Sequence, residues 1–188
     1  MATPLLSSAC RRRPLSPRVR KSGKRETGNG TRHSLPVSAA DEAGIGAALA
    51  QARLAAASDE VPVGAVVVRR ENPIARGHNE TVARGDPTAH AELLAIQQAL
   101  KTLGADRLDD CTLYVTLEPC AQCAGAIVLA KVARLVFGAY DPKAGMAGSV
   151  GDLLRHPKLN HRVEVIGGVE AEACGELLRD YFRAKRAE

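Results

Sequence analysis

Aromatic side chains are scarce in this chain, which holds no tryptophan, two phenylalanines and three tyrosines among 188 residues. Its core must therefore be filled by Val, Leu, Ile and Ala, and 45% of the residues are hydrophobic. Long apolar runs are also missing, since no stretch approaches the roughly 18 apolar residues that a membrane-spanning helix needs. The composition predicts one globular domain with a sizeable core and no membrane association.

Disulfide bonds are not expected either. The five cysteines are an odd number, and a chain of this length does not need disulfides to hold its core together. Cys120 and Cys123 form a C-x-x-C pair. In such a chain this pair is typical of metal or redox chemistry in a reducing compartment, so we expect a cytoplasmic protein.

Positive charge is concentrated at the N-terminus. Residues 1–40 hold nine Lys and Arg against one acid, Glu26, for a net charge of +8, whereas the remaining residues carry −3 of the total of +5. The segment is rich in Arg, Ser, Gly and Pro without apolar periodicity, which predicts disorder. It is either a dispensable extension or a transit peptide, and a transit peptide would place the protein in an organelle. The folded domain is expected over residues 41–188.

Apolar periodicity in that domain predicts alternating helices and strands. Helices are predicted over residues 41–57, 88–103, 121–131 and 169–186. Strands are predicted over residues 63–68, 74–78, 111–117, 133–137 and 163–166. The first two strands should form a hairpin, and the strand–helix–strand unit should be a right-handed parallel crossover. We therefore expect an α/β fold, a three-layer α/β/α sandwich around a mixed five-stranded sheet.

Two short motifs combine side chains that bind zinc. His90 and Glu92 form an H-x-E motif, and Pro119, Cys120 and Cys123 belong to a P-C-x-x-C motif thirty residues later. One imidazole and two thiolates suit Zn²⁺, and three protein ligands leave the fourth tetrahedral position for water. Both motifs fall where a helix begins, and cysteines three residues apart on a helix face the same way. The motifs predict a catalytic zinc site.

Glu92 is placed to act on the zinc-bound water without binding the metal itself. Zinc lowers the pKa of bound water to about 7, and Glu92 would carry protons between this water and the substrate. One alternative is a structural zinc site, which needs a fourth ligand, but Cys111 lies one strand upstream, at the far end from Cys120. The other is a redox C-x-x-C pair, which explains neither His90 nor Glu92.

The two motifs resemble the signature of the zinc nucleobase and nucleoside deaminases. Longer blocks around them, within residues 41–186, resemble the bacterial tRNA-specific adenosine deaminase family. These blocks cover residues 59–65, 85–92, 113–120, 135–139, 145–149, 154–157 and 159–163. The resemblance implies hydrolytic deamination of adenosine to inosine at the wobble position of an arginine tRNA anticodon. Zinc-activated hydroxide would attack C6, and ammonia would leave.

The resemblance also implies roles for individual residues. One Zn²⁺ per subunit would be held by His90, Cys120 and Cys123, with Glu92 as the acid/base. Asn79 would hydrogen-bond the flipped base through its amide, although a turn-stabilising asparagine is the alternative. Three further residues are either pocket walls or ordinary core: Val61, Leu117 and Phe137.

Contacts with the RNA are expected from two regions. Asp141 resembles a family position near the substrate backbone, or it caps the turn before Pro142. The last predicted helix ends in cations and aromatics that could contact phosphates and stack on an extruded nucleotide, or that anchor the helix and solvate its end. These residues are Arg179, Tyr181, Phe182, Arg183, Lys185 and Arg186. A second basic stretch of this kind holds Arg155, His156, Lys158, His161 and Arg162.

We therefore predict that a tRNA anticodon stem-loop is the partner, and the resemblance implies a homodimer with no other obligatory protein partner. Two rival functions remain. A free-base or nucleotide deaminase of the same fold would act without RNA. A non-catalytic RNA-binding subunit would keep zinc for stability alone, but such a subunit would have no need of Glu92.

Overall fold

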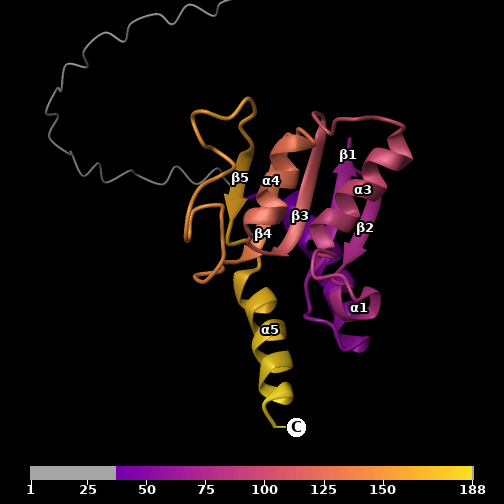
Figure 1. The fold of residues 1–188 in the computed structure, drawn as a ribbon, viewed down its shortest axis with the longest axis vertical. Coiled ribbons are helices and arrows are strands. Elements are labelled where there is room, and N and C mark those ends of the chain that lie inside the picture. Colours follow the sequence, from indigo (N-terminus) through magenta and orange to yellow (C-terminus); the bar gives the residue numbers. More distant parts are fainter. Residues whose placement is uncertain (1–36, 188) are drawn as a thin grey trace, which may run out of the picture. The chain divides into compact units, whose positions relative to one another are not determined.

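The computed structural model describes residues 37–187, so the predictions for residues 1–36 lie outside the described part. Five strands form one sheet in the order β2-β1-β3-β4-β5 (Figure 1). They are β1 (Gly64–Arg69), β2 (Asn72–His78), β3 (Cys111–Leu117), β4 (Arg134–Ala139) and β5 (Glu164–Gly167). β1 pairs antiparallel with β2 and β3, whereas β3, β4 and β5 are parallel. The predicted mixed sheet is confirmed.

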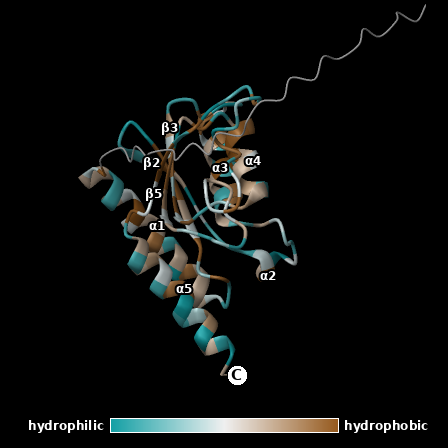
Figure 2. Cartoon of the chain, turned by 90° about the vertical axis from the view of Figure 1, so that its left-hand side faces the viewer, coloured by the Kyte–Doolittle hydropathy of each residue, from teal (hydrophilic) through white to brown (hydrophobic). Residues whose placement is uncertain are grey.

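Helices cover both faces of this sheet, as the edge-on view in Figure 2 shows. On one face lie α1 (Ala39–Ala57) and α5 (Ala171–Lys185), and on the other lie α3 (Ala91–Leu103) and α4 (Ala121–Leu129). The three-layer α/β/α prediction is confirmed. In the described part of the chain, no helix is long and apolar enough to span a membrane.

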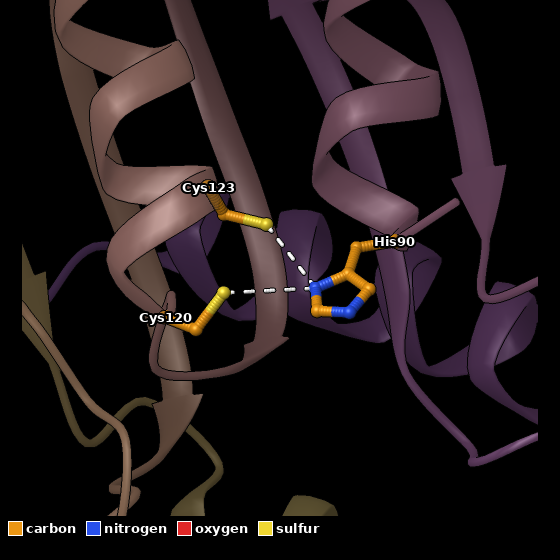
Figure 3. A group of neighbouring side chains, drawn as sticks. All are labelled: His90, Cys120 and Cys123. Atoms are coloured by element: carbon orange, nitrogen blue, oxygen red, sulfur yellow. Dashed lines mark hydrogen bonds between the residues drawn. The ribbon is translucent and has the colours of Figure 1, made fainter. Parts of the chain in front are cut away.

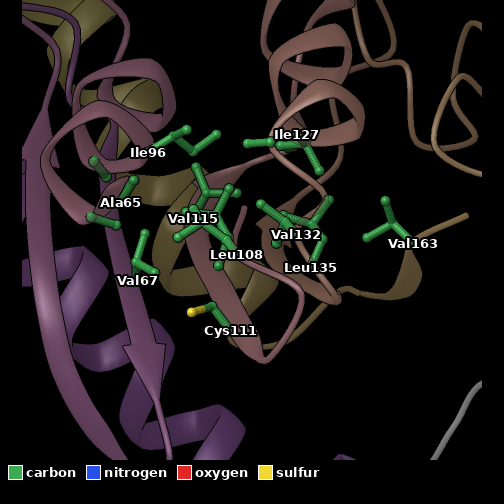
Figure 4. Packing of buried hydrophobic residues seen from close by; sticks show 14 of the residues in the cluster. Ala65, Val67, Ile96, Leu108, Cys111, Val115, Ile127, Val132, Leu135 and Val163 are labelled. Carbon is green, nitrogen blue, oxygen red and sulfur yellow. The ribbon is translucent and has the colours of Figure 1, made fainter. Parts of the chain in front are cut away.

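The core consists of two clusters, one on each face of the sheet, because side chains of a strand alternate between its faces. Val66 and Tyr114 pack against α1, in the cluster that also holds Cys174 of α5. The next residues along the two strands, Val67 and Val115, point to the opposite face and belong to the larger cluster under α3 and α4. In Figure 4, Ile96 of α3 and Ile127 of α4 lie over Val115 of β3. Apart from Phe137 in one cluster and Tyr114 in the other, the residues of both clusters are aliphatic or cysteine, as the shortage of aromatics predicted.

The structure differs from the sequence predictions mainly at element ends. α1 begins at Ala39, two residues early, because Ser38 and Asp41 form a reciprocal capping box. α3 begins at Ala91, three residues later than predicted. A single-turn helix, α2 (Thr81–Arg84), was not predicted, since four residues are too few to show a helical period.

One close contact between a strand and a helix positions the site described below. A Cβ atom added at Gly77 of β2 would overlap the carbonyl oxygen of Ala91 and the backbone nitrogen of Ala95. Glycine therefore allows β2 to pack directly against the first turn of α3. Because Ala91 follows His90 in the chain, this contact holds the histidine beside the end of β2.

Candidate metal centre and active site

Three potential metal ligands meet where α3 and α4 begin. His90 is the N-cap residue of α3, and Cys120 is the N-cap residue of α4. Both have extended backbone, with ψ angles of 150° and 178°. Cys123 lies in the first turn of α4 and is buried. The positive end of the α4 dipole therefore lies at the two thiols that would bind as anions, whereas the start of α3 carries His90, which would bind as a neutral imidazole.

The distances between these side chains fit zinc. Nδ1 of His90 lies 3.6 Å from Sγ of Cys120 and 3.5 Å from Sγ of Cys123 (Figure 3). A tetrahedral ion with Zn–S bonds of about 2.3 Å and a Zn–N bond of about 2.0 Å would place nitrogen and sulfur about 3.5 Å apart. The donor atoms of the three residues all lie within 4.8 Å of one another. The donor set and its spacing therefore suit Zn²⁺.

The group contains no fourth protein ligand among residues 37–187. Cys111 lies at the start of β3, and Cys174 lies in α5, and neither belongs to the group. A structural zinc site is closed by four protein ligands, whereas a catalytic site keeps one position open. The three-residue group matches the catalytic pattern.

The thiols influence each other strongly. Hydrogen bonds from Cys123 and then from His90 lower the pKa of Cys120 to about 3. The hydrogen bond to Cys120, together with burial, raises the pKa of Cys123. The hydrogen bond to Cys120 also raises the pKa of His90. One thiolate thus forms readily, and a divalent cation would favour loss of the second thiol proton as well.

Glu92 lies beside this group without belonging to it. It is the second residue of α3, and its side chain is buried. Burial raises the pKa of Glu92, and the carboxylate also contributes to the raised pKa of Cys123. A buried carboxyl group next to a three-ligand metal group is the arrangement that the H-x-E motif predicted.

Asn79 directly follows β2 and is buried. The N–H of Glu80 donates to the carbonyl oxygen of Ala89 at 3.0 Å, so Asn79 lies beside the chain that leads into His90. The Asn79 amide nitrogen donates to the carboxylate of Glu60 at 3.2 Å. Sequence analysis did not single out Glu60, whose only signal was its place in the resembling block at residues 59–65.

A second buried carboxylate that sequence reasoning missed is Glu118, which fixes the loop after β4. It accepts hydrogen bonds from the backbone N–H groups of Asp141 at 3.1 Å, Ala147 at 2.9 Å and Ser149 at 3.0 Å. Asp141 in turn accepts from the N–H of Lys143 at 2.9 Å, as its turn-capping alternative predicted. The loop is thereby held next to the start of α4.

A groove of about 690 Å³ lies between this loop and α5. Seven of the predicted site residues line it: Val61, Leu117, Asp141, Arg179, Phe182, Arg183 and Arg186. Lys143, which was not predicted, adds a fourth cation to the three arginines of its wall. Phe182 is 44% exposed, so an aromatic face is available at this cationic surface.

Several predicted contact residues do not line the groove, among them Asn79, Phe137, Tyr181 and Lys185. Phe137 is buried in the core, where its ring packs edge-on against Tyr140 with centroids 5.1 Å apart. The hydroxyl of Tyr181 donates to the carbonyl oxygen of Asp59 at 3.1 Å, which is the helix-anchoring contact of the alternative interpretation. Their roles in substrate binding stay predictions.

The second basic stretch also lies outside the lining of the groove. Arg155 pairs with Asp152 at 2.7 Å and donates to the carbonyl oxygen of Ala147 at 2.9 Å. Nε2 of His161 is hydrogen-bonded to the carbonyl oxygen of Val132 at 2.7 Å. These contacts fix the segment between β4 and β5, and an RNA contact there stays a prediction.

The chain is similar in sequence to known deaminases over its folded domain. The model of the MafB19-like deaminase family matches residues 41–186. The tRNA-specific adenosine deaminase of Bacillus subtilis (strain 168) is 47% identical over 146 residues, which cover 78% of this chain and 91% of the relative. The chain belongs to the tRNA-specific adenosine deaminase family. The family resemblance inferred from the sequence is confirmed.

Solved structures of related deaminases support the fold of this tRNA-specific adenosine deaminase family member. One comes from a study of A-to-I editing by tRNA:A34 deaminases at the wobble position of transfer RNA. It is 43% identical with a TM-score of 0.70, covering 72% of this chain and 99% of that chain. A guanine deaminase from Nitrosomonas europaea is 27% identical with a TM-score of 0.67, covering 83% of this chain and 98% of that chain. The fold is thus shared by deaminases of different substrates.

Proposed function

We propose that this enzyme hydrolyses adenosine to inosine at the wobble position of a tRNA anticodon, with zinc as its cofactor and an arginine tRNA as its substrate. The observation that carries this proposal is the group of His90, Cys120 and Cys123 with buried Glu92 beside it. The names of the relatives support the choice of adenosine in tRNA over a free base.

The residues of the chain divide the reaction between them. His90, Cys120 and Cys123 would hold zinc, which supplies the Lewis acidity that makes water a nucleophile at neutral pH. Glu92 takes a proton from the attacking water on its carboxylate and delivers it to a ring nitrogen of adenine. It then helps to protonate the amino group at C6, which leaves as ammonia. Adenosine and water thus give inosine and ammonia.

The groove beside α5 is proposed to hold the RNA around the extruded adenosine. A base inside a stack cannot reach a buried site, so such enzymes act on an unstacked nucleotide. Arg183 would meet a phosphate, Phe182 would stack on a base, and Asp141 would accept a hydrogen bond from the RNA backbone. Asn79 would bind the target nucleotide next to the metal.

The test uses zinc-loaded enzyme and anticodon stem-loops with adenosine at the wobble position. Wild type should form inosine, and Glu92→Gln, which keeps the shape but cannot exchange a proton, should not. Free adenosine, cytidine and guanine should stay unchanged, and Arg183→Ala should raise the KM for RNA. Turnover of a free base or nucleoside without RNA would favour the rival deaminase, whereas zinc-loaded wild type without any product would favour a non-catalytic subunit.

We also propose that the enzyme is a homodimer in the cytoplasm, as the family resemblance implies. Sedimentation of the full chain should give twice the mass of one subunit, and a single-subunit mass would contradict the dimer. Fractionation of the source cells should recover the protein with the cytoplasm. Recovery from an organelle would favour the transit-peptide interpretation of the N-terminal segment.

A further inference from the structure

The carboxylate of Glu60 connects three parts of the chain: the segment before β1, the residue after β2 and the single-turn helix α2. Glu60 is 1% exposed and lies between α1 and β1. One oxygen, Oε1, accepts the backbone N–H groups of Val82 and Ala83, both at 2.7 Å. The other, Oε2, accepts the Thr81 hydroxyl at 3.1 Å and the Asn79 amide nitrogen at 3.2 Å. Its two oxygens thus have separate partners.

Glu60 is ionised despite its position. Burial alone would raise the pKa of Glu60, but the hydrogen bonds from Ala83, Thr81, Val82 and Asn79 outweigh burial, and the pKa is lowered. An ionised carboxylate accepts hydrogen bonds and donates none. The side of the Asn79 amide that faces Glu60 must therefore be its NH₂ group.

This orientation leaves the other side of the amide open. The Asn79 nitrogen also donates to Oγ1 of Thr81 at 3.1 Å, so both of its hydrogens have protein acceptors. No donor to Oδ1 of Asn79 is found within residues 37–187. Every completely buried side-chain oxygen or nitrogen atom in the same residues has a hydrogen-bond partner. Because Oδ1 has none, it must be accessible to solvent. It is an accessible acceptor on an otherwise buried residue.

We propose that Glu60 is a positioning residue, which locks the Asn79 amide so that Oδ1 faces the substrate and accepts a hydrogen bond from it. The inference rests on the proposed role of Asn79 in substrate binding. A freely turning amide could donate a hydrogen bond to the substrate or accept one from it. With its NH₂ group held by Glu60 and Thr81, Asn79 can only accept, so it recognises a donor group on the substrate. On adenosine in RNA, that donor is the exocyclic amino group or the ribose 2′-hydroxyl.

Glu60→Gln reverses this lock with little change in shape. Its oxygen can replace Oε1 and still accept from Val82 and Ala83, which puts its NH₂ group where Oε2 was. Asn79 must then turn its own oxygen towards residue 60 and its NH₂ group towards the substrate. Because donor would meet donor, kcat/KM for the stem-loop should fall about 10-fold or more while zinc content stays unchanged.

A matched control removes a neighbouring charge without touching Asn79. Glu80 is the N-cap residue of α2, and its carboxylate pairs with Arg84. Glu80→Gln should retain wild-type kcat/KM. A comparable loss in both variants would show that charge near α2, not the orientation of the amide, sets the activity, and would overturn the inference.

The second arm restores the acceptor by reversing the hydrogen bond. In the double variant with Glu60→Gln and Asn79→Asp, one aspartate oxygen accepts from the glutamine NH₂ group and the other again faces the substrate. The double variant should recover most of the activity, whereas Asn79→Asp alone should lose it because two carboxylates then face each other. If Glu60→Gln does not fold, the comparison of Asn79→Asp with the double variant carries the test.

The outcomes separate this inference from the proposed function. Activity of Glu60→Gln equal to wild type, or a double variant no better than its parents, would overturn the positioning role. Unchanged activity in Asn79→Ala would overturn the substrate role of Asn79 itself. A stem-loop with 2′-deoxyadenosine at the target distinguishes the donors: equal rates for wild type and Glu60→Gln indicate the hydroxyl, and a persistent deficit indicates the amino group.

Discussion

Arg134 and Asp41 form a two-pronged ion pair across 93 positions of sequence, with Nη1 2.6 Å from Oδ1 and Nη2 3.0 Å from Oδ2. Asp41 is fully buried, and it also completes the capping box at the start of α1. Arg134 begins β4. The pair therefore attaches the N-terminal end of α1 to the central sheet.

This pair should make the stability of the protein depend on pH in the acid range. The hydrogen bond with Arg134 is the main cause that lowers the pKa of Asp41 to about 2. A lowered carboxyl pKa stabilises the fold at pH values above the unfolded pKa, and that contribution is lost as pH falls from about 4 towards 2. Asp41→Asn should reduce the free energy of unfolding by about 2 kcal/mol near neutral pH.

Urea unfolding of wild type and Asp41→Asn at several pH values measures this contribution. The difference between the two proteins should be constant above about pH 5 and shrink below pH 4. A difference that does not change with pH would mean that Asp41 contributes through packing and capping alone.

Two glycines of similar sequence context should respond in opposite ways to alanine. A Cβ atom at Gly64 of β1 would overlap the carbonyl oxygen of Ala48 in α1, whereas at Gly46 nothing lies within 4 Å. Gly64→Ala should destabilise the fold by about 3 kcal/mol or more, because the helix must move away from the sheet. Gly46→Ala should stabilise it by about 0.5–1 kcal/mol, since alanine favours the helix. Thermal unfolding measures both, and equal effects would contradict the close packing of α1 on β1.

Glu118 should control the order of the loop that carries Asp141. Its carboxylate accepts the N–H groups of Ala147 and Ser149, and the Ser149 hydroxyl also donates to it. In Glu118→Gln, the side-chain NH₂ group faces some of these N–H and O–H donors. This should lower the free energy of unfolding by about 1–3 kcal/mol. Amide exchange at Ala147 and Ser149 should accelerate, and stem-loop turnover should fall. Glu164→Gln, a change of one exposed carboxylate, is the control and should leave both unchanged.

Removal of single cysteines should separate metal binding from packing. Cys123→Ser removes a metal ligand. It should therefore weaken zinc affinity by more than the roughly 10–100-fold that is lost when a residue that only hydrogen-bonds a ligand is removed. Cys111→Ser should keep wild-type zinc affinity, because Cys111 lies outside the metal group. Competition with a chromophoric chelator measures both. Loss of zinc from Cys111→Ser would favour a site with a fourth protein ligand.

The sequence predicted the parts of the molecule that depend on local patterns. Apolar periodicity located the five strands and four of the helices, and ligand spacing identified His90, Cys120 and Cys123. α1 begins two residues earlier than predicted because Ser38 and Asp41 form a capping box, and α3 begins three residues later because the backbone stays extended up to its N-cap residue, His90. The residue types that cap helices also occur in turns, so the sequence alone does not fix the first residue of a helix.

The supporting carboxylates could not be predicted from the sequence. The partners of Glu60 lie 19 to 23 positions away, and the partners of Glu118 lie 23 to 31 positions away. Only the fold brings these donors to the two side chains. Both glutamates lie in sequence blocks that resemble the family. Such a block indicates the family, but it does not show which of its residues form hydrogen bonds that position other side chains or loops. Tyr181 was ambiguous for the same reason, since its anchoring contact with Asp59 spans 122 positions.

X-ray absorption of the zinc-loaded full chain tests the central claim, an open three-ligand zinc site, most directly. The account predicts about one zinc per chain, bound by two sulfur atoms near 2.3 Å, one imidazole nitrogen and one further light atom near 2.0 Å. A coordination shell with three or four sulfur atoms, or a chain that retains no zinc, would contradict it.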